Sequence, residues 1–132
     1  MATTQETLQV SSIVPNFTVD DLRKSIAFYE ALGFTVDERW EENGQLLGVM
    51  LGTGKQQIGL SQDDWKKGRD RKKGVGLRIF ISTPQNVDQI ASRAKSAGIK
   101  LDHEPHDTEW KTRAFAVTDP SGFLLTISSE MP

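Results

Sequence analysis

The chain has two histidines, His103 and His106, which lie three residues apart among four carboxylates. Proteins build most sites for zinc and other first-row metals from imidazole, carboxylate and thiolate groups, so this segment is a candidate metal site. Pro105 separates the histidines and argues against a helix that would bring both rings to one face. In extended chain, side chains three residues apart point to opposite faces. The pattern therefore favours a solvated acidic loop, with a metal site as the alternative.

Two arginines, Arg78 and Arg113, lie in predicted strands among apolar residues. A guanidinium in such surroundings needs a partner, which an anionic ligand or a carboxylate of the protein could provide. An internal salt bridge is the favoured interpretation for both. Ser61 and Ser128 lie in other predicted strands, but neither has an evident base that would activate it as a nucleophile. No catalytic residue is therefore predicted.

The elements that would position these residues occur twice along the chain. In the first half, an extended run over residues 13–19 leads into a helix that stops at Gly33. In the second half, residues 76–81 lead into a helix that stops at Gly98. The strands expected after the helices are residues 34–36, 46–51 and 57–61 in the first half and 99–101, 113–118 and 123–128 in the second. A unit of strand, helix and three strands, βαβββ, is thus predicted twice, and the two copies should pair to bury their apolar faces.

The predicted fold class is α+β, with two βαβββ modules in tandem that together form one domain. The expected parts are an N-terminal tail at 1–10, a first module at 11–61, a charged connector at 62–73 and a second module at 74–129. The connector is rich in lysine and arginine, so a mobile, solvated segment is expected there. Thr83 followed by Pro84 predicts the N-cap and first residue of the second helix.

The composition is that of an ordinary soluble globule, because 36% of the 132 residues are hydrophobic and 26% are charged. A formal net charge of −2 argues against a nucleic-acid partner. The chain has no cysteine, which excludes disulfides and thiol chemistry. The polar N-terminus does not resemble a signal peptide, and no apolar run approaches the roughly 20 residues that span a bilayer. A cytoplasmic protein without a membrane partner is expected.

Three local patterns follow one another along the chain. They are Val19-Asp20-Asp21-Leu22 with Ser25, Phe28-Tyr29 and Leu32-Gly33-Phe34; Trp110 with Arg113-Ala114-Phe115; and Asp119-Pro120-Ser121-Gly122-Phe123. In this order and spacing they resemble the vicinal oxygen chelate superfamily, which includes glyoxalase I, bleomycin-resistance proteins and extradiol dioxygenases. The resemblance implies paired βαβββ modules, each with a curved mixed sheet around a shared cavity. In metal-using relatives, side chains from the first and last strands of each module hold a divalent ion that acts as a Lewis acid.

Counted from these patterns, the metal-ligand positions that the resemblance implies are Val14, Gly59, Gly76 and Thr126, with Leu77 or Arg78 in place of Gly76 if the register slips. Valine and glycine have no side-chain donor, and a threonine hydroxyl alone is a poor ligand. We therefore expect no metal and no other cofactor, and the metal chemistry of the family is not carried over to this chain.

The side chains expected around the cavity form a plausible ligand-binding surface instead, because they combine neutral polar groups with a cation and aromatic rings. Trp65 and Trp110 could cap the cavity mouth, or each could anchor its own loop. The predicted ligand-binding residues are Val14, Asn16, Gly59, Trp65, Gly76, Arg78, Phe80, Trp110, Arg113 and Thr126.

The leading functional hypothesis is a metal-free protein that sequesters a small molecule, similar to the bleomycin-resistance branch. Members of that branch are dimers with sites between subunits, so a homodimer is expected. Bleomycin itself is not the expected ligand, because it is cationic and this chain is only mildly acidic. One alternative is a metal-dependent glyoxalase-like lyase or dioxygenase with non-standard ligands. Another is a structural or regulatory module whose cavity is filled by its own side chains.

Overall fold

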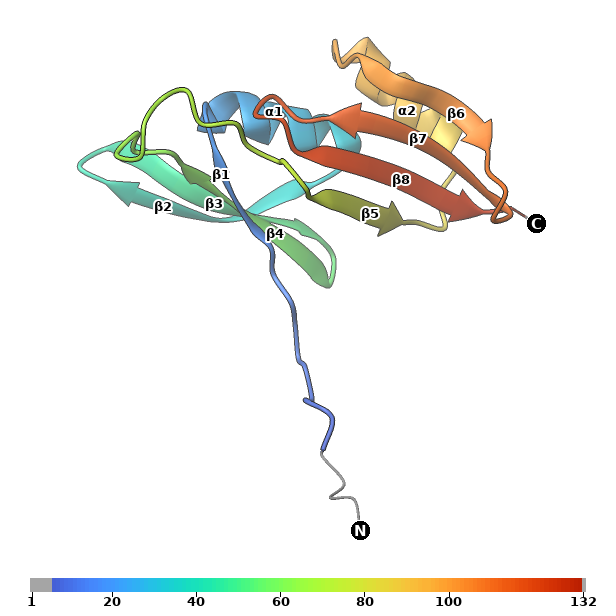
Figure 1. Ribbon diagram of the computed structural model, residues 1–132, viewed down its shortest axis with the longest axis horizontal. Coiled ribbons are helices and arrows are strands. Elements are labelled where there is room, and N and C mark those ends of the chain that lie inside the picture. The colour runs from blue at the N-terminus through green and yellow to red at the C-terminus, as the bar shows by residue number, and fades with distance from the viewer. Residues whose placement is uncertain (1–5, 132) are drawn as a thin grey trace.

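The computed structural model describes residues 6–131, and within them the βαβββ unit is found twice (Figure 1). The first module contains β1 (Asn16–Val19), α1 (Leu22–Leu32), β2 (Thr35–Glu42), β3 (Gln45–Thr53) and β4 (Gln56–Gln62). The second contains β5 (Arg78–Ser82), α2 (Val87–Ser96), β6 (Leu101–Asp107), β7 (Thr112–Thr118) and β8 (Leu124–Glu130). The strand orders are β1-β4-β3-β2 and β5-β8-β7-β6. In each sheet the first strand is parallel to the last and the other pairs are antiparallel, so the predicted α+β tandem fold is confirmed.

The helix α1 ends at Gly33, as its sequence predicts, and begins after Asp21. The carboxylate of Asp21 accepts a hydrogen bond from Lys24 N at 3.2 Å and caps the first turn. Gly33 follows the helix in a left-handed conformation, with φ of 110°. Both helices are short, with 11 and 10 residues, and no helix within residues 6–131 is long and apolar enough to cross a membrane.

The helix α2 starts later than predicted. Asn86, and not Thr83, is the N-cap, and its side chain accepts a hydrogen bond from Gln89 N at 3.2 Å. Thr83 instead accepts one from Gln85 N in the turn before the helix. Both residue types cap helices well, so the choice between them depends on packing. Val87 is 1% exposed and faces the core. The helix therefore begins at Val87, and the residue before it, Asn86, is the cap.

The segment that contains the histidines is a strand, not the predicted loop. β6 lies along β7, and its register shifts between Leu101 and His103 and again between His103 and His106. At such β-bulges one strand has an extra residue. His103 therefore pairs with Ala116 and His106 with Ala114, which share one face of the sheet. The expectation of opposite faces is wrong, and the two ring centroids lie 6.3 Å apart.

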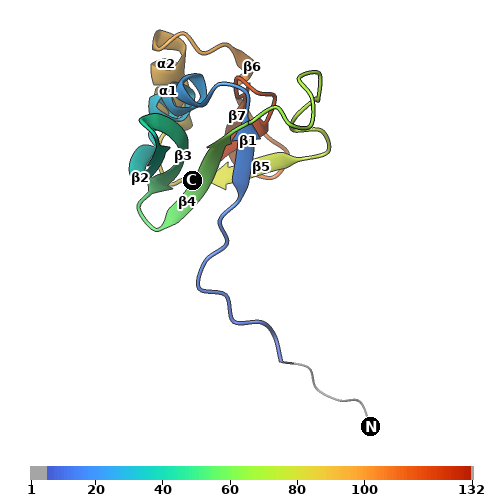
Figure 2. The same cartoon turned by 90° about the vertical axis from the view of Figure 1, so that its left-hand side faces the viewer.

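The two modules pack on each other within one chain (Figures 1 and 2). α1 contacts α2. Phe17 of β1 stacks on Phe123, which precedes β8, with ring centroids 4.4 Å apart and planes inclined by 11°. The Tyr29 hydroxyl of α1 donates a buried hydrogen bond to Asp119 Oδ2 at 2.9 Å. The buried apolar side chains of both modules thus form a single core.

Each sheet has one face against the helices and one open face. Residues that face the helices on the central strands are fully buried, for example Leu60 of β4 and Leu125 of β8, both 0% exposed. Because side chains alternate along a strand, the neighbouring residues belong to the other face. There Phe80 is 73% exposed. The open faces are therefore where long side chains remain available to a ligand or a partner.

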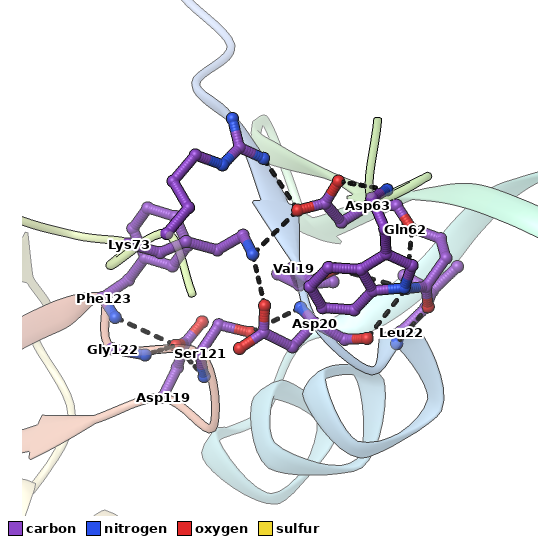
Figure 3. A network of polar contacts seen from close by, with 12 residues as sticks. Val19, Asp20, Leu22, Gln62, Asp63, Lys73, Asp119, Ser121, Gly122 and Phe123 are labelled. Atoms are coloured by element: carbon purple, nitrogen blue, oxygen red, sulfur yellow. Dashed lines mark hydrogen bonds and ion pairs between the residues drawn. The ribbon is translucent and has the colours of Figure 1, made fainter. Parts of the chain in front are cut away.

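The connector between the modules is tied down at both ends, although a mobile segment was expected (Figure 3). Asp63 is 5% exposed, accepts a hydrogen bond from Trp65 N at 2.9 Å, and forms ion pairs with Lys73 at 2.9 Å and Arg71 at 2.7 Å. Lys73 also pairs with Asp20. These contacts, that with Lys73 first, hold the pKa of Asp63 well below its usual range. Between the ends, the Lys66 side chain is 84% exposed and solvated as predicted.

Candidate functional site

The open face of the second sheet carries an arginine and a phenylalanine side by side. Arg78 and Phe80 are alternate residues of β5, so both project from the same face. Arg78 Nη1 donates a hydrogen bond to Thr126 Oγ1 of β8 at 3.2 Å. Among residues 6–131, no carboxylate forms an ion pair with Arg78, so the predicted internal salt bridge is not found there. The guanidinium is exposed and uncompensated next to an exposed ring.

The open face of the first sheet offers neutral hydrogen-bonding groups. Asn16 of β1 pairs with Gly59 of β4, and its Nδ2 donates a hydrogen bond to Ser61 Oγ at 3.1 Å. A Cβ at position 59 would collide with Asn16 Oδ1, so the glycine makes room for the amide. Val14, 38% exposed, precedes β1. Asn16 and Gly59 are thus brought together as predicted.

Two residues of this face were not predicted from the sequence. A register shift in β2 between Val36 and Glu38 turns Asp37 toward Gln57, whose Nε2 donates a hydrogen bond to Asp37 Oδ2 at 2.9 Å. Trp40, 46% exposed, lies beside Gly48, where a Cβ would be 3.4 Å from the indole ring. The only sequence signal for either is the glycine on the neighbouring strand, since the bulge depends on pairing between strands.

The registers of the two modules correct one predicted position. Gly59 pairs with Asn16, which is two residues after Val14. Thr126 pairs with Phe80, which is two residues after Arg78. The counterpart of Val14 in the second module is therefore Arg78, the residue expected for a slipped register. Gly76 lies in the turn before β5 with φ of 78°, so its placement in the strand is wrong.

The residues at the family's metal-ligand positions do not fit a metal ion. Val14 and Gly59 provide no donor atom, Thr126 provides one neutral hydroxyl, and the guanidinium of Arg78 carries a positive charge that repels a cation. Nowhere in residues 6–131 do three or more histidine, aspartate or glutamate side chains converge as a metal site would require.

The histidine pair lies at the outer edge of the second open face. His106 Nδ1 is 2.8 Å from the carbonyl oxygen of Glu104, so in the neutral ring the proton resides on Nδ1 and Nε2 is the free acceptor. A free Nε2 is suited to a metal. Two imidazoles are nevertheless one ligand short of a catalytic zinc site, which uses three protein ligands. The pair can act as a weak surface chelate.

Three predicted site residues lie away from the open faces. Arg113 is held by Asp88 at 2.7 and 3.0 Å and by Asp107 at 2.8 Å, so the internal salt bridge is confirmed for this arginine. Its hydrogen bonds hold the pKa of Asp88 below the usual range. Trp65 lies under the Lys73 ammonium, 4.8 Å from the ring centroid, and serves as a connector anchor. Trp110 is 74% exposed in the loop between β6 and β7.

A hollow of about 640 Å³ lies elsewhere, at the junction of the modules between the β3–β4 hairpin and the start of α2. Its lining includes Phe34, Gly52, Ile81 and Pro84, with Arg93 as the charged member. None of the predicted site residues lines it. We place the candidate site on the open faces instead, because they combine the uncompensated arginine with exposed rings and free hydrogen-bonding groups.

Comparisons with known proteins agree with this architecture. The sequence profile of the Glyoxalase/Bleomycin resistance protein/Dioxygenase superfamily matches residues 10–127. A search of curated proteins gave no significant match. TioX from Micromonospora sp. ML1 is similar with a TM-score of 0.74 and 18% identity, over 92% of this chain and 100% of TioX. The hypothetical protein SA1046 from S. aureus gives a TM-score of 0.72 and 22% identity, over 92% and 95%.

A third solved structure is a glyoxalase/bleomycin resistance protein/dioxygenase from Alicyclobacillus acidocaldarius. It has a TM-score of 0.68 and 21% identity over 92% of each chain. At such identities these structures support the fold and carry no information about the ligand.

Proposed function

Because the chain belongs to the glyoxalase/bleomycin resistance protein/dioxygenase superfamily, we propose that it is a metal-free member that binds and sequesters a small molecule. The observation that carries this proposal is the set of residues at the family's metal-ligand positions, namely Val14, Gly59, Arg78 and Thr126. An arginine at such a position attracts negative charge and cannot bind a cation. The open faces would then bind a ligand without the help of a Lewis acid.

We further propose that a second copy of the chain packs over the open faces and so completes the ligand cavity. On a single chain, the open faces leave large apolar side chains in water, including Phe80 at 73%, Trp40 at 46% and Val14 at 38% exposure. Apolar side chains gathered on one surface favour burial against a partner. In a homodimer, the polar first face of one subunit and the cationic second face of the other would enclose the ligand between them.

The alternative is a metal-dependent lyase or dioxygenase with non-standard ligands. One observation favours it: His103 and His106 share the open face, with Nε2 of His106 free. Such an enzyme would need a third ligand from a partner subunit or from its substrate. This possibility has to be separated from the main proposal by experiment.

The test is the metal content of the purified protein after incubation with nickel, zinc, iron(II) or manganese and desalting. The wild type is compared with a double variant, His103→Ala with His106→Ala, which removes the surface chelate. We expect the double variant to retain less than about one-tenth of an equivalent, and any excess in the wild type to come from the histidine pair. Near-stoichiometric metal in the double variant would overturn the metal-free proposal, and near-stoichiometric metal in the wild type that the double variant loses would favour the metal-dependent alternative.

A further inference from the structure

We propose that the ligand of this site is a planar aromatic anion, whose carboxylate or other oxyanion binds the guanidinium of Arg78 while its ring lies on Phe80. The inference rests on the proposed function, because it names the chemical class that the same surface would bind. It is carried by the contrast between Arg78 and the other strand arginine, Arg113.

Arg113 shows what a satisfied arginine looks like in this fold. Its guanidinium donates three hydrogen bonds to two carboxylates, two to Asp88 and one to Asp107. Arg78 occupies the corresponding kind of place, a strand residue among apolar neighbours, but its one described contact is with a neutral hydroxyl of Thr126. A guanidinium has five N–H donors in a planar fork, so most of those of Arg78 remain available for a bidentate oxyanion.

Phe80 provides the second half of the recognition. It is 73% exposed and lies two residues after Arg78 on the same face, which places the two Cα atoms about 7 Å apart. A bicyclic aromatic acid is long enough to reach the guanidinium with its carboxylate while its ring system covers Phe80. Offset stacking between such rings adds to the area that each buries.

The surrounding groups leave the positive charge of Arg78 uncompensated. Ala114 and Ala116 of β7 are small and lie on the same face as Thr126 and Ser128. Two carboxylates near the open faces already accept hydrogen bonds within the protein, Asp37 from Gln57 on the first sheet and Asp102 from Thr118 on the second. A ligand anion would therefore meet small or neutral neighbours around the guanidinium.

The test uses 2-naphthoate and its neutral analogue 2-naphthamide, which have nearly the same shape but differ in charge. Both are titrated into the full-length protein, and binding is followed by NMR shifts of the labelled protein and by calorimetry. We expect naphthoate to bind more tightly than naphthamide and to shift the resonances of Arg78 and Phe80. In Arg78→Gln the affinity for naphthoate should fall at least about tenfold, while that for naphthamide stays unchanged.

Two further variants locate the interaction. Phe80→Ala should weaken both probes, because it removes the stacking surface and leaves the charge. A double variant in the exposed connector, Lys66→Gln with Lys67→Gln, should change neither affinity. If the connector variant abolishes naphthoate binding and Arg78→Gln does not, the anion binds the basic loop and the inference is overturned.

The remaining outcomes separate this inference from the proposed function. If both probes bind equally on the open face and Arg78→Gln has no effect, the protein is a ligand binder whose ligand is not an anion, and only the inference fails. If neither probe binds at millimolar concentration, the aromatic-anion class is overturned. The metal analysis of the histidine double variant then decides the proposed function independently.

Discussion

The first and second modules have the same topology but present different chemistry on their open faces. The first face is built on Gly48 and Gly59 and carries the neutral groups of Asn16 and Ser61. The second face carries Arg78 beside an exposed ring. On the helix side the modules match, since both bury aliphatic and aromatic side chains in one core. A doubled fold can therefore repeat its packing while each copy contributes a different half of a site.

The largest test of this comparison concerns the shared core. Phe115 of β7 is 0% exposed, and Phe115→Ala should lower the free energy of unfolding by about 3–5 kcal/mol. Because the core spans both modules, urea unfolding followed by fluorine-labelled Trp40 and Trp110 should give one midpoint for both probes. Leu8→Ala in the N-terminal tail, where the side chain is 82% exposed, serves as the control and should change stability by less than about 0.5 kcal/mol. A shift seen by Trp110 alone would mean that the modules unfold separately.

The next effect concerns the passage from the connector into the second module. Gly74 and Gly76 both have φ of 78°, so an alanine at either should cost about 1–2 kcal/mol of backbone strain. A Cβ at Gly74 would also collide with the carbonyl of Gly122 in the β7–β8 turn, whereas nothing lies within 4 Å of one at Gly76. Gly74→Ala should therefore lose about 1–3 kcal/mol more than Gly76→Ala in chemical denaturation. Equal losses would show that the connector does not pack on that turn.

A smaller effect is expected at the polar link between the modules. Tyr29→Phe removes the hydrogen bond to Asp119 and should cost about 1.5–3 kcal/mol, measured by urea unfolding. Burial, and then the charge of Asp119, raises the pKa of the Tyr29 hydroxyl above its ordinary value of 10.0. The stabilisation is thus fully present below about pH 10 and is lost as the pH rises further.

Tyr29 is the only tyrosine of the chain, so the absorbance of tyrosinate reports this residue alone. The folded protein should show no tyrosinate at pH 10.5, while the urea-unfolded protein should. Ordinary titration near pH 10 in the folded state would contradict the buried link.

The smallest effects should appear at acidic pH, where two carboxylates have a lowered pKa, Asp63 in the connector and Asp88 in the second module. Both Asp63 and Asp88 contribute stability above the unfolded pKa of about 3.8, and this contribution is lost as the pH falls below it. Asp63→Asn should therefore flatten the fall in melting temperature between pH 5 and pH 2, and Asp88→Asn should do so less. The Asp88 side chain is 49% exposed and that of Asp63 is 3% exposed.

Salt separates the two carboxylates. At about 1 M NaCl the effect of Asp88→Asn should vanish, because exposed pairs are screened, and that of Asp63→Asn should persist. If salt removed both effects alike, the burial of the Asp63 cluster would not matter to its strength.

The sequence predicts the repeat well, because its evidence is local. The alternation of apolar residues, the Asp21 cap and the Gly33 stop are each encoded within a few residues. The bulges of β6 and the position of Asp37 depend on how two strands align, which no local pattern determines. The ties of the connector depend on partners as far apart as Asp20 and Lys73, 53 residues along the chain.

The candidate site likewise combines features that local sequence predicts with features that depend on how distant segments align. Arg78 and Phe80 could be placed on one face from strand alternation alone, whereas Gly59 and Thr126 are placed by counting from the patterns that resemble the family. Arg113 lies on the opposite face from Arg78, yet the two have similar local sequence surroundings. Which arginine finds a carboxylate is decided by α2 supplying Asp88, and that contact exists only in the folded chain.

The ion pair between the two ends of the connector also affects how the molecule would respond to a cut in its backbone. Asp63 and Lys73 bring the ends of the segment together, and the tip between them is exposed and rich in the residues that trypsin recognises. Cleavage at the tip would separate the chain into two fragments of similar length. The stacked Phe17 and Phe123 and the Tyr29–Asp119 hydrogen bond lie outside the cut, so they would continue to join the fragments. The protein is thus a natural candidate for fragment complementation, in which two separately produced halves reassemble into one structure.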